Sequence, residues 1–185
     1  DTLGHPAGHT LLRLVSLRLR EVIGDRGQVG RLGGDEFEVV LPATSAPDEL
    51  SALAQGIIDS LSRPYTINGN VVSIGASVGI VASDYDDRTS DDLMRDADLA
   101  LYAGKAAGKG CFCFFAAEMH EAARERQRIE SDLRVALEKG HLRVVFQPSV
   151  DASSEAVTGF EALVRWDHAE RGPISATVFI PLAEE

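Results

Sequence analysis

The sequence RLGGDEFEVVLP, residues 31 to 42, decides how the rest of the chain is interpreted. Apolar and polar residues alternate on both sides of it, which predicts strands at 28–32 and 37–41 joined as a hairpin. Gly33 and Gly34 leave backbone amides exposed at the tip, where an anion can approach. Asp35 and Glu36 are suited to hold a divalent cation or accept a proton. The alternative is a solvated acidic turn, because Gly and Asp dominate turns for local reasons.

Helical periodicity surrounds this hairpin. A helix is predicted from His9 to Ile23, and a second begins near Pro47, where Asp48 and Glu49 follow in the first turn. A third is predicted to be capped by Ser90. The apolar stripes expected to face the core are Leu11, Leu12, Val15, Leu19, Val22 and Ile23; then Leu50, Leu53, Ala54, Ile57, Ile58 and Leu61; then Leu93, Met94, Ala97 and Leu101.

Further strands complete the first part of the chain. A second hairpin is expected from strands at 65–67 and 71–81, turning at Asn68-Gly69, where both residues tolerate positive φ. A short strand at 111–115 closes the region. This order of helices and strands predicts an α+β fold in which helices cover an antiparallel sheet.

The composition excludes several classes of function. At 185 residues and 44% hydrophobic, the chain can bury a complete core and part of a second. The net charge of −11 argues against binding a nucleic acid polymer, so a phosphate ligand should be small. No apolar run approaches the roughly 20 residues that span a bilayer, so no membrane contact is expected from this segment. Reduced thiols at Cys111 and Cys113 favour a cytoplasmic protein, with a membrane anchor possible elsewhere in a longer parent.

A change in composition follows residue 115. Residues 117–139 are rich in charge and carry a narrow apolar stripe, which predicts a connector helix about 35 Å long. Strands are expected beyond it at 142–146 and 157–166, around a polar turn at 151–155. Three regions are therefore predicted, namely 1–115, 116–140 and 141–185. Because the chain opens on Asp1 instead of Met, we expect it to be a fragment of a longer protein.

Several motifs in order resemble the GGDEF family, the diguanylate cyclases. Besides Arg31–Phe37, they are Asp1-Thr2-Leu3-Gly4-His5, Ser77-Val78-Gly79-Ile80 and Asp96-Ala97-Asp98-Leu99-Ala100-Leu101-Tyr102, followed by Lys105 and Lys109. After the connector, Phe146-Gln147-Pro148 and Gly159-Phe160-Glu161-Ala162-Leu163-Val164-Arg165-Trp166 resemble the opening of an EAL domain, the cyclic-di-GMP phosphodiesterase family. The resemblance implies a palm-like sheet similar to nucleotidyl cyclases, then a connector helix and the first strands of an incomplete TIM-like barrel.

The resemblance also implies a reaction. Two copies, a homodimer, would each hold one GTP with Mg²⁺ or Mn²⁺ and join them into cyclic-di-GMP. Gly33 and Gly34 would let the backbone approach the phosphates, Asp35 would assist deprotonation of the attacking hydroxyl, and Glu36 would bind the metal. Lys105 and Lys109 lie where the family contacts the triphosphate, although lysines at a helix end are also favourable without a ligand.

Three departures from the family pattern weaken the cyclase interpretation. The family has a strand with a metal-binding Asp upstream of residue 1, so this segment alone is not expected to turn over GTP. His9 replaces an acid that contacts guanine, and a neutral imidazole accepts at only one nitrogen. The family's inhibitory Arg-x-x-Asp site falls on Gly24 and Gly27 here, so product inhibition at that site is not expected.

In the second region, the resemblance implies that Glu161 is a metal ligand, Arg165 a phosphate contact and Gln147 a substrate-facing residue. The remaining ligands of an EAL site are not in this sequence, so hydrolysis by this segment alone is not expected. Three interpretations of the parent stay open: an enzyme of cyclic-di-GMP turnover, a GTP-sensing domain that controls a phosphodiesterase, or an inert spacer. We favour a retained nucleotide site with reduced or absent synthesis.

Overall fold

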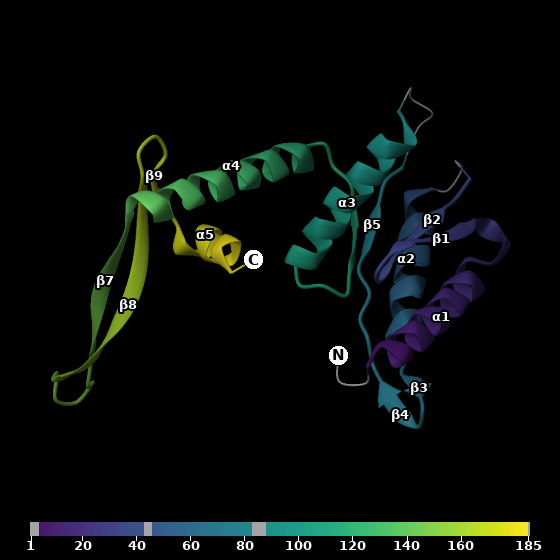
Figure 1. The fold of residues 1–185 in the computed structure, drawn as a ribbon, viewed down its shortest axis with the longest axis horizontal. Coiled ribbons are helices and arrows are strands. Elements are labelled where there is room, and N and C mark those ends of the chain that lie inside the picture. The colour runs from purple at the N-terminus through teal and green to yellow at the C-terminus, as the bar shows by residue number, and fades with distance from the viewer. Residues whose placement is uncertain (1–3, 43–45, 83–87, 185) are drawn as a thin grey trace. The chain divides into compact units, whose positions relative to one another are not determined.

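The computed structural model describes residues 4–42, 46–82 and 88–184 and divides into two compact units, Asp1–Met119 and His120–Glu185 (Figure 1). The first unit contains, in chain order, α1 (Gly4–Ile23), the 3-10 helix η1 (Gly24–Arg26), β1 (Gln28–Gly33), β2 (Glu36–Val40), α2 (Pro47–Ser62), β3 (Tyr65–Ile67), β4 (Asn70–Val72), β5 (Val78–Ile80), α3 (Ser90–Ala106) and β6 (Phe112–Phe114). The boundary falls in the first turn of α4 (Glu118–Lys139), and the second unit contains the rest of α4, β7 (Leu142–Val150), β8 (Val157–His168), β9 (Gly172–Ile174) and α5 (Ala176–Ala183).

Helices α1 and α2 bury part of the apolar stripes that their periodicity predicts, and the remaining predicted positions are half-buried. Val15, Leu19 and Ile23 of α1 are buried at intervals of four residues, and α2 buries Ala54, Ile57, Ile58 and Leu61. Helix α1 begins at Gly4, five residues before the predicted start. Pro6 is tolerated there because the first N–H groups of a helix have no partner within it.

Arg18 joins α1 to the end of α2. Its guanidinium donates to the carbonyl oxygens of Ser60 at 3.1 Å, Arg63 at 2.6 Å and Pro64 at 2.8 Å. It also lies 3.7 Å from the ring centroid of the buried Tyr65. The last carbonyls of a helix lack partners within it, so this one side chain satisfies the α2 terminus and fixes the packing of the two helices.

The buried face of α3 differs from the prediction. Leu93, Met94, Ala97 and Leu101 are only half-buried, whereas the residues fully buried along α3 are Asp96, Ala100 and Gly104. Asp96 is 1% exposed and forms an ion pair with Arg88. The periodicity was misinterpreted because it counts an aspartate as a surface residue, and a buried carboxylate needs a cationic partner to lie inward.

Helix α3 also begins with a different cap from the one predicted. Thr89, not Ser90, is the N-cap residue: its hydroxyl accepts from the Asp92 amide at 3.2 Å, and the Asp92 carboxylate accepts from the Thr89 amide at 3.2 Å. This reciprocal pair is a capping box. The hydrogen bonds from Thr89 lower the pKa of the Asp92 carboxyl.

The strands pair in twos across the described part of the first unit. β1 with β2 and β3 with β4 are antiparallel hairpins, as predicted. The predicted strand 71–81 is instead divided into β4 and β5, which pair with different partners. β5 and β6 are parallel, contrary to the antiparallel pairing expected, because α3 crosses over between them and returns the chain in the same direction.

Glycine allows α3 to pack closely on β5. A Cβ at Gly79 would overlap the Ala97 carbonyl oxygen and would lie 2.5 Å from the Leu101 amide nitrogen. Gly104, near the other end of the helix, is buried against Cys113 of β6. The backbone of α3 therefore lies directly on the β5–β6 pair, which determines where the helix ends and its following loop begins.

The second unit is built on the β7–β8 hairpin. Both strands are longer than the predicted 142–146 and 157–166, and β9 extends the sheet along β8. Trp166 is 1% exposed and packs edge-to-face on Phe179 of α5, with ring centroids 5.5 Å apart. Leu133 and Ala136 of α4 complete this core. The described part of the chain contains no helix long and apolar enough to cross a membrane.

The tip of the β7–β8 hairpin is organised by one carboxylate. Asp151 accepts hydrogen bonds from the amides of Ser153 and Ser154 at 3.0 and 2.8 Å, and from both of their hydroxyls. These hydrogen bonds lower the pKa of the Asp151 carboxyl well below its usual range, because they favour the charged form.

We predict that Gly79→Ala destabilises the first unit by about 1–3 kcal/mol, because the added methyl group meets backbone atoms of α3 that cannot move independently. Urea denaturation followed by circular dichroism measures the change. Gly30→Ala is the matched control: Gly30 also lies in a strand, and a Cβ there meets nothing within 4 Å. Equal denaturation midpoints for the two variants would contradict the close packing of α3 on β5.

We predict that the β7–β8 turn weakens in acid. Because the pKa of Asp151 is lower in the folded hairpin than the roughly 3.9 of an unfolded chain, its contribution is fully present above about pH 4. That contribution is lost as the pH falls through the lowered folded pKa. An NMR titration of the Ser153 and Ser154 amides should show this transition, and Asp151→Asn should abolish it. A midpoint at the ordinary aspartate pKa would contradict the hydrogen-bonded turn.

Candidate functional site

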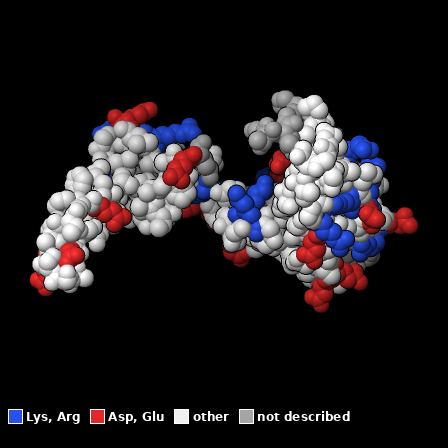
Figure 2. All heavy atoms as spheres, turned by 90° about the horizontal axis from the view of Figure 1, so that it is seen from below, with Lys and Arg blue, Asp and Glu red and all other residues white. Residues whose placement is uncertain are grey.

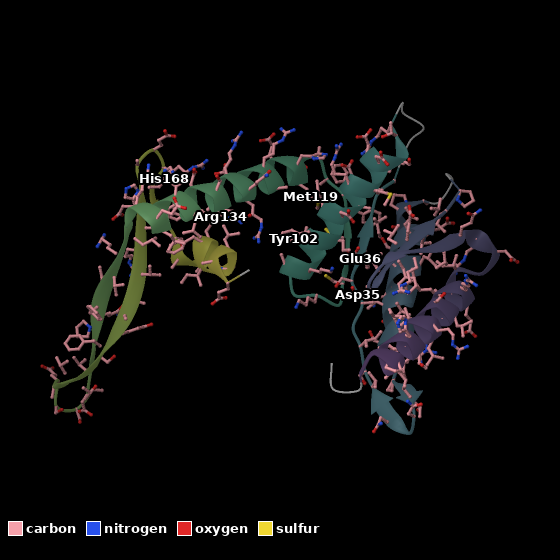
Figure 3. All side chains as sticks on the ribbon, viewed as in Figure 1. Asp35, Glu36, Tyr102, Met119, Arg134 and His168 are labelled. Atoms are coloured by element: carbon pink, nitrogen blue, oxygen red, sulfur yellow. The ribbon has the colours of Figure 1, made fainter. Side chains whose placement is uncertain are left out.

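The hairpin tip is formed by a two-residue turn, Gly34-Asp35. Gly33 pairs with Glu36, and the register shifts between Arg31 and Gly33, which leaves Leu32 out of the ladder. Gly34 has a φ of +49°, in the left-handed region that favours glycine. The turn is therefore tighter than the four-residue connection predicted, and Glu36 belongs to β2. Figure 3 shows Asp35 and Glu36 at this end of the hairpin.

Arg31 holds the turn from one side. Its Nε and Nη2 atoms both donate to the Gly34 carbonyl oxygen, at 3.1 and 2.6 Å. Two donors on one acceptor orient the peptide that links Gly34 to Asp35, so the turn has a side-chain brace in addition to its strand pairing. The sequence identifies Arg31 only as part of a motif. Nothing in the local pattern indicates where its side chain points.

The tip is open to solvent. Gly33, Gly34, Asp35 and Glu36 are all exposed, and a Cβ built on either glycine meets nothing within 4 Å. The described residues therefore leave the glycine backbone and the two carboxylates accessible together. Burial under neighbouring segments would have excluded a phosphate ligand here.

The two candidate lysines lie at the end of α3. Lys105 is in the last turn of the helix, and Lys109 follows in the loop before β6. Both are exposed. Lys109 has a φ of +62°, uncommon for a residue with a side chain, and Gly108 and Gly110 beside it also have positive φ. Both lysines therefore lie at or just after the C-terminal end of α3. The packing of α3 on β5 fixes the position of that end.

His9 is exposed on α1. Among the described residues, no hydrogen bond or ion pair joins His9, Lys105 or Lys109 to Asp35 or Glu36. The structure brings the two glycines and two carboxylates together in one turn, and it does not connect the histidine or the lysines to that turn directly.

In the second unit, the structure brings two of the three candidate residues together. Gln147 of β7 lies directly opposite Glu161 of β8, so their side chains share one face of the hairpin. Arg165 lies on that face four residues along β8, opposite Arg143. Arg143 is neutralised by Asp167 through an ion pair of 2.8 Å, which leaves the Arg165 guanidinium without a carboxylate partner among the described residues.

The carboxylates at the tip can supply some of the ligands of a hard cation, but not all of them. Asp35 and Glu36 supply carboxylate oxygens, the ligands that Mg²⁺ prefers, and Mg²⁺ commonly takes only one or two carboxylates and completes its shell with water and phosphate oxygens. The Gly34 carbonyl is occupied by Arg31. No group of three or more His, Cys, Asp or Glu side chains able to hold a metal ion occurs among the described residues.

The backbone favours glycine at positions 24 and 27, where the resemblance places an inhibitory site in other sequences. Gly24 has a φ of +55°, where a side chain is strained. A Cβ at Gly27 would overlap the Val40 carbonyl oxygen and lie 2.6 Å from Leu41 Cδ2. An arginine at 24 would be strained and an aspartate at 27 would overlap its neighbours in this backbone, and the lack of product inhibition stays a prediction.

Sequence reasoning missed a charged network between α4 and the turn after β8. Arg171 pairs with Glu125, and the Asp132 carboxylate lies 3.2 Å from His168 Nε2. His168 Nδ1 accepts from the Glu170 amide at 3.1 Å, so Nε2 carries the proton and donates to Asp132. The sequence predicts a charge-rich connector helix, and the structure adds that Glu125 and Asp132 of this helix pair with residues of the turn after β8.

Residues 1–111 match the family described as diguanylate cyclase, GGDEF domain, and residues 130–185 match the EAL domain family. Together with the mixed helix and sheet fold and its glycine-acid turn, this match shows that the chain belongs to the GGDEF family.

Individual relatives agree with this assignment. The chain is 38% identical over 185 residues to the bifunctional diguanylate cyclase/cyclic di-GMP phosphodiesterase MucR of Pseudomonas aeruginosa, covering 100% of this chain and 27% of MucR. It is also 38% identical to the cyclic di-GMP phosphodiesterase PdeR of Escherichia coli, covering 100% of this chain and 28% of PdeR. The chain thus spans about a quarter of the length of these curated relatives.

Solved structures support the fold. The GGDEF domain of PA1120 (TpbB or YfiN) from Pseudomonas aeruginosa has a TM-score of 0.62 and 31% identity, covering 67% of this chain and 73% of that one. The S helix-GGDEF-EAL structure of Vibrio cholerae LapD, bound to c-di-GMP, has a TM-score of 0.54 over 98% of this chain and 42% of that one. At 19% identity, the LapD likeness shows the fold alone.

Proposed function

We propose that the first unit binds GTP with a divalent cation, Mg²⁺ or Mn²⁺, at the Gly33–Glu36 turn of a cyclic-di-GMP signalling protein. The observation that carries the proposal is the turn itself: two glycines and two carboxylates are exposed together on a hairpin braced by Arg31. Gly34 alone would serve a purely structural turn, but the exposed backbone of Gly33 beside it and the two adjacent carboxylates also leave room for a phosphate and a cation. The membership in the GGDEF family and the likeness to MucR support the same substrate.

The residues of the turn have distinct roles in this proposal. Gly33 and Gly34 allow phosphate oxygens to approach the backbone, since no side chain covers the tip. Glu36 is the main metal ligand, and Asp35 is placed to accept the proton of an attacking ribose hydroxyl. The cation, when bound, neutralises charge on the triphosphate. Lys105 and Lys109 add point charges for the outer phosphates.

The condensation of two GTP molecules into cyclic-di-GMP needs a second copy of the domain, so a homodimer belongs to the cyclase form of the proposal. Intact Asp35 and Glu36 favour this form. His9 favours a weaker or lost cyclase activity, because its imidazole cannot accept from both donors of guanine as a carboxylate does. We therefore propose reduced or absent synthesis, with GTP sensing as the role of the first unit.

The second unit is proposed to belong to a phosphodiesterase for cyclic-di-GMP. Glu161 would bind a metal ion, and Gln147 directly opposite and Arg165 on the same face would contact the substrate. The likeness to the phosphodiesterase PdeR supports this assignment. GTP bound at the first unit would then modulate hydrolysis by the complete enzyme.

We predict that Glu36→Gln weakens Mg²⁺-dependent GTP binding by the full-length protein about tenfold or more, because a charge-assisted metal ligand is lost. Isothermal titration calorimetry with and without Mg²⁺ measures this, and Glu21→Gln on the exposed face of α1 is the matched control. Unchanged GTP binding by Glu36→Gln would disprove the proposed site. Robust cyclic-di-GMP synthesis that is lost in Asp35→Ala would instead establish the cyclase form and refute pure sensing.

We predict that His9→Asp increases the preference for GTP over ATP. A carboxylate can accept from the N1 and N2 donors of guanine together, and adenine offers no such pair. Competition of GTP and ATP for the unmodified protein and the variant measures the ratio, and His120→Asp outside the first helix serves as a control. An unchanged ratio would show that His9 does not face the base.

A further inference from the structure

The loop after α3 holds an unusual backbone conformation at Lys109. Gly108, Lys109 and Gly110 have successive φ values of +136°, +62° and +63°. Glycine adopts such angles at little cost, but a lysine in this region is strained unless the surroundings fix it. The ammonium group of Lys109 is therefore presented by a backbone that needs external support.

Ser77 supplies that support. Its hydroxyl oxygen accepts a hydrogen bond from the Gly110 amide at 3.0 Å, across 33 positions of the sequence. It is the one side-chain hydrogen bond to the backbone of 108–110 within the described residues. The Lys109 amide donates to the Gly104 carbonyl at 3.3 Å, which ties the other side of the lysine to the end of α3.

Pairing between the β5 segment and the chain after Gly110 fixes the position of Ser77. Ser77 is half-buried and directly precedes β5, and the next amide, that of Val78, donates to the Cys111 carbonyl at 3.0 Å. Gly110 and Cys111 are thus both held by consecutive residues of the β5 segment. Lys109 directly precedes this anchor in the loop, so the anchor fixes the backbone from which its side chain extends.

We infer that Ser77 is a positioning residue that orients Lys109 toward the phosphates of the bound nucleotide. This inference rests on the proposed function, in which Lys109 contacts the triphosphate. The serine acts through the backbone of Gly110 and does not itself need to touch the ligand. Its loss should therefore weaken recognition of the triphosphate and leave recognition of the nucleoside unchanged.

The first test needs no ligand. In the full-length protein, Ser77→Ala should increase hydrogen exchange of the Gly110 amide about fivefold, the effect of losing one ordinary hydrogen bond. Ser77→Thr keeps the hydroxyl and should restore protection. Ser73→Ala is the matched control, an exposed serine of the same segment. Unchanged exchange at Gly110 in Ser77→Ala would overturn the inference.

The second test is a double-mutant cycle with Mg²⁺-GTP and guanosine in calorimetry. Ser77→Ala and Lys109→Ala should each weaken GTP binding, by about fivefold for the serine, without changing guanosine binding. In the Lys109→Ala protein, adding Ser77→Ala should have no further effect. Additive effects, or equal losses for GTP and guanosine, would overturn the positioning role.

The two proposals fail in different ways. If the unmodified protein binds no Mg²⁺-GTP, the proposed function fails, and the role of Ser77 toward phosphate fails with it. If the unmodified protein binds Mg²⁺-GTP and Ser77→Ala binds it equally well, only the inference on Ser77 is overturned.

Discussion

The close contact between α3 and β5 is the constraint on which the first unit depends. Gly79 removes the side chain that would separate them, and the helix backbone lies directly on the strand. The β5–β6 pair becomes parallel because α3 connects the two strands across this contact. The end of α3 and the loop that carries Lys109 take their positions from it. A side chain at 79 would overlap backbone atoms of α3.

The sequence was sufficient where the pattern is local. The apolar stripes of α1 and α2, the hairpin around Gly34 and the turn at Asn68-Gly69 each follow from residues close together in the chain, and the structure confirms them. The two glycines and two carboxylates of the tip were predicted to be neighbours for the same reason. Their roles toward a ligand remain predictions.

The features that were missed depend on where polar side chains point, whether their partners are near or far in the chain. Asp96 can be buried because it forms an ion pair with Arg88, which lies before α3. The periodicity of α3 does not indicate this pair. Arg31 points at the Gly34 carbonyl, and Ser77 meets Gly110 across the β5–β6 pair. Glu125 and Asp132 of α4 pair with Arg171 and His168, which lie far along the chain, so the pattern of α4 does not indicate these contacts. The sequence shows the same residue type whether a polar side chain points into the core or into solvent. Only the fold distinguishes the two cases.

The β7–β8 hairpin has an apolar surface that is exposed to solvent. Val144, Phe146 and Phe160 are 57%, 66% and 67% exposed, and in Figure 2 this arm carries few charged atoms along its length. Opposed residues of the two strands share a face, so Phe160 lies opposite Pro148 and on the same side of the hairpin as Phe146. Exposed aromatic surface on a long hairpin promotes aggregation. Residues 1–185 purified alone should therefore aggregate at high concentration. A detergent or a polar substitution at Phe160 would reduce this aggregation.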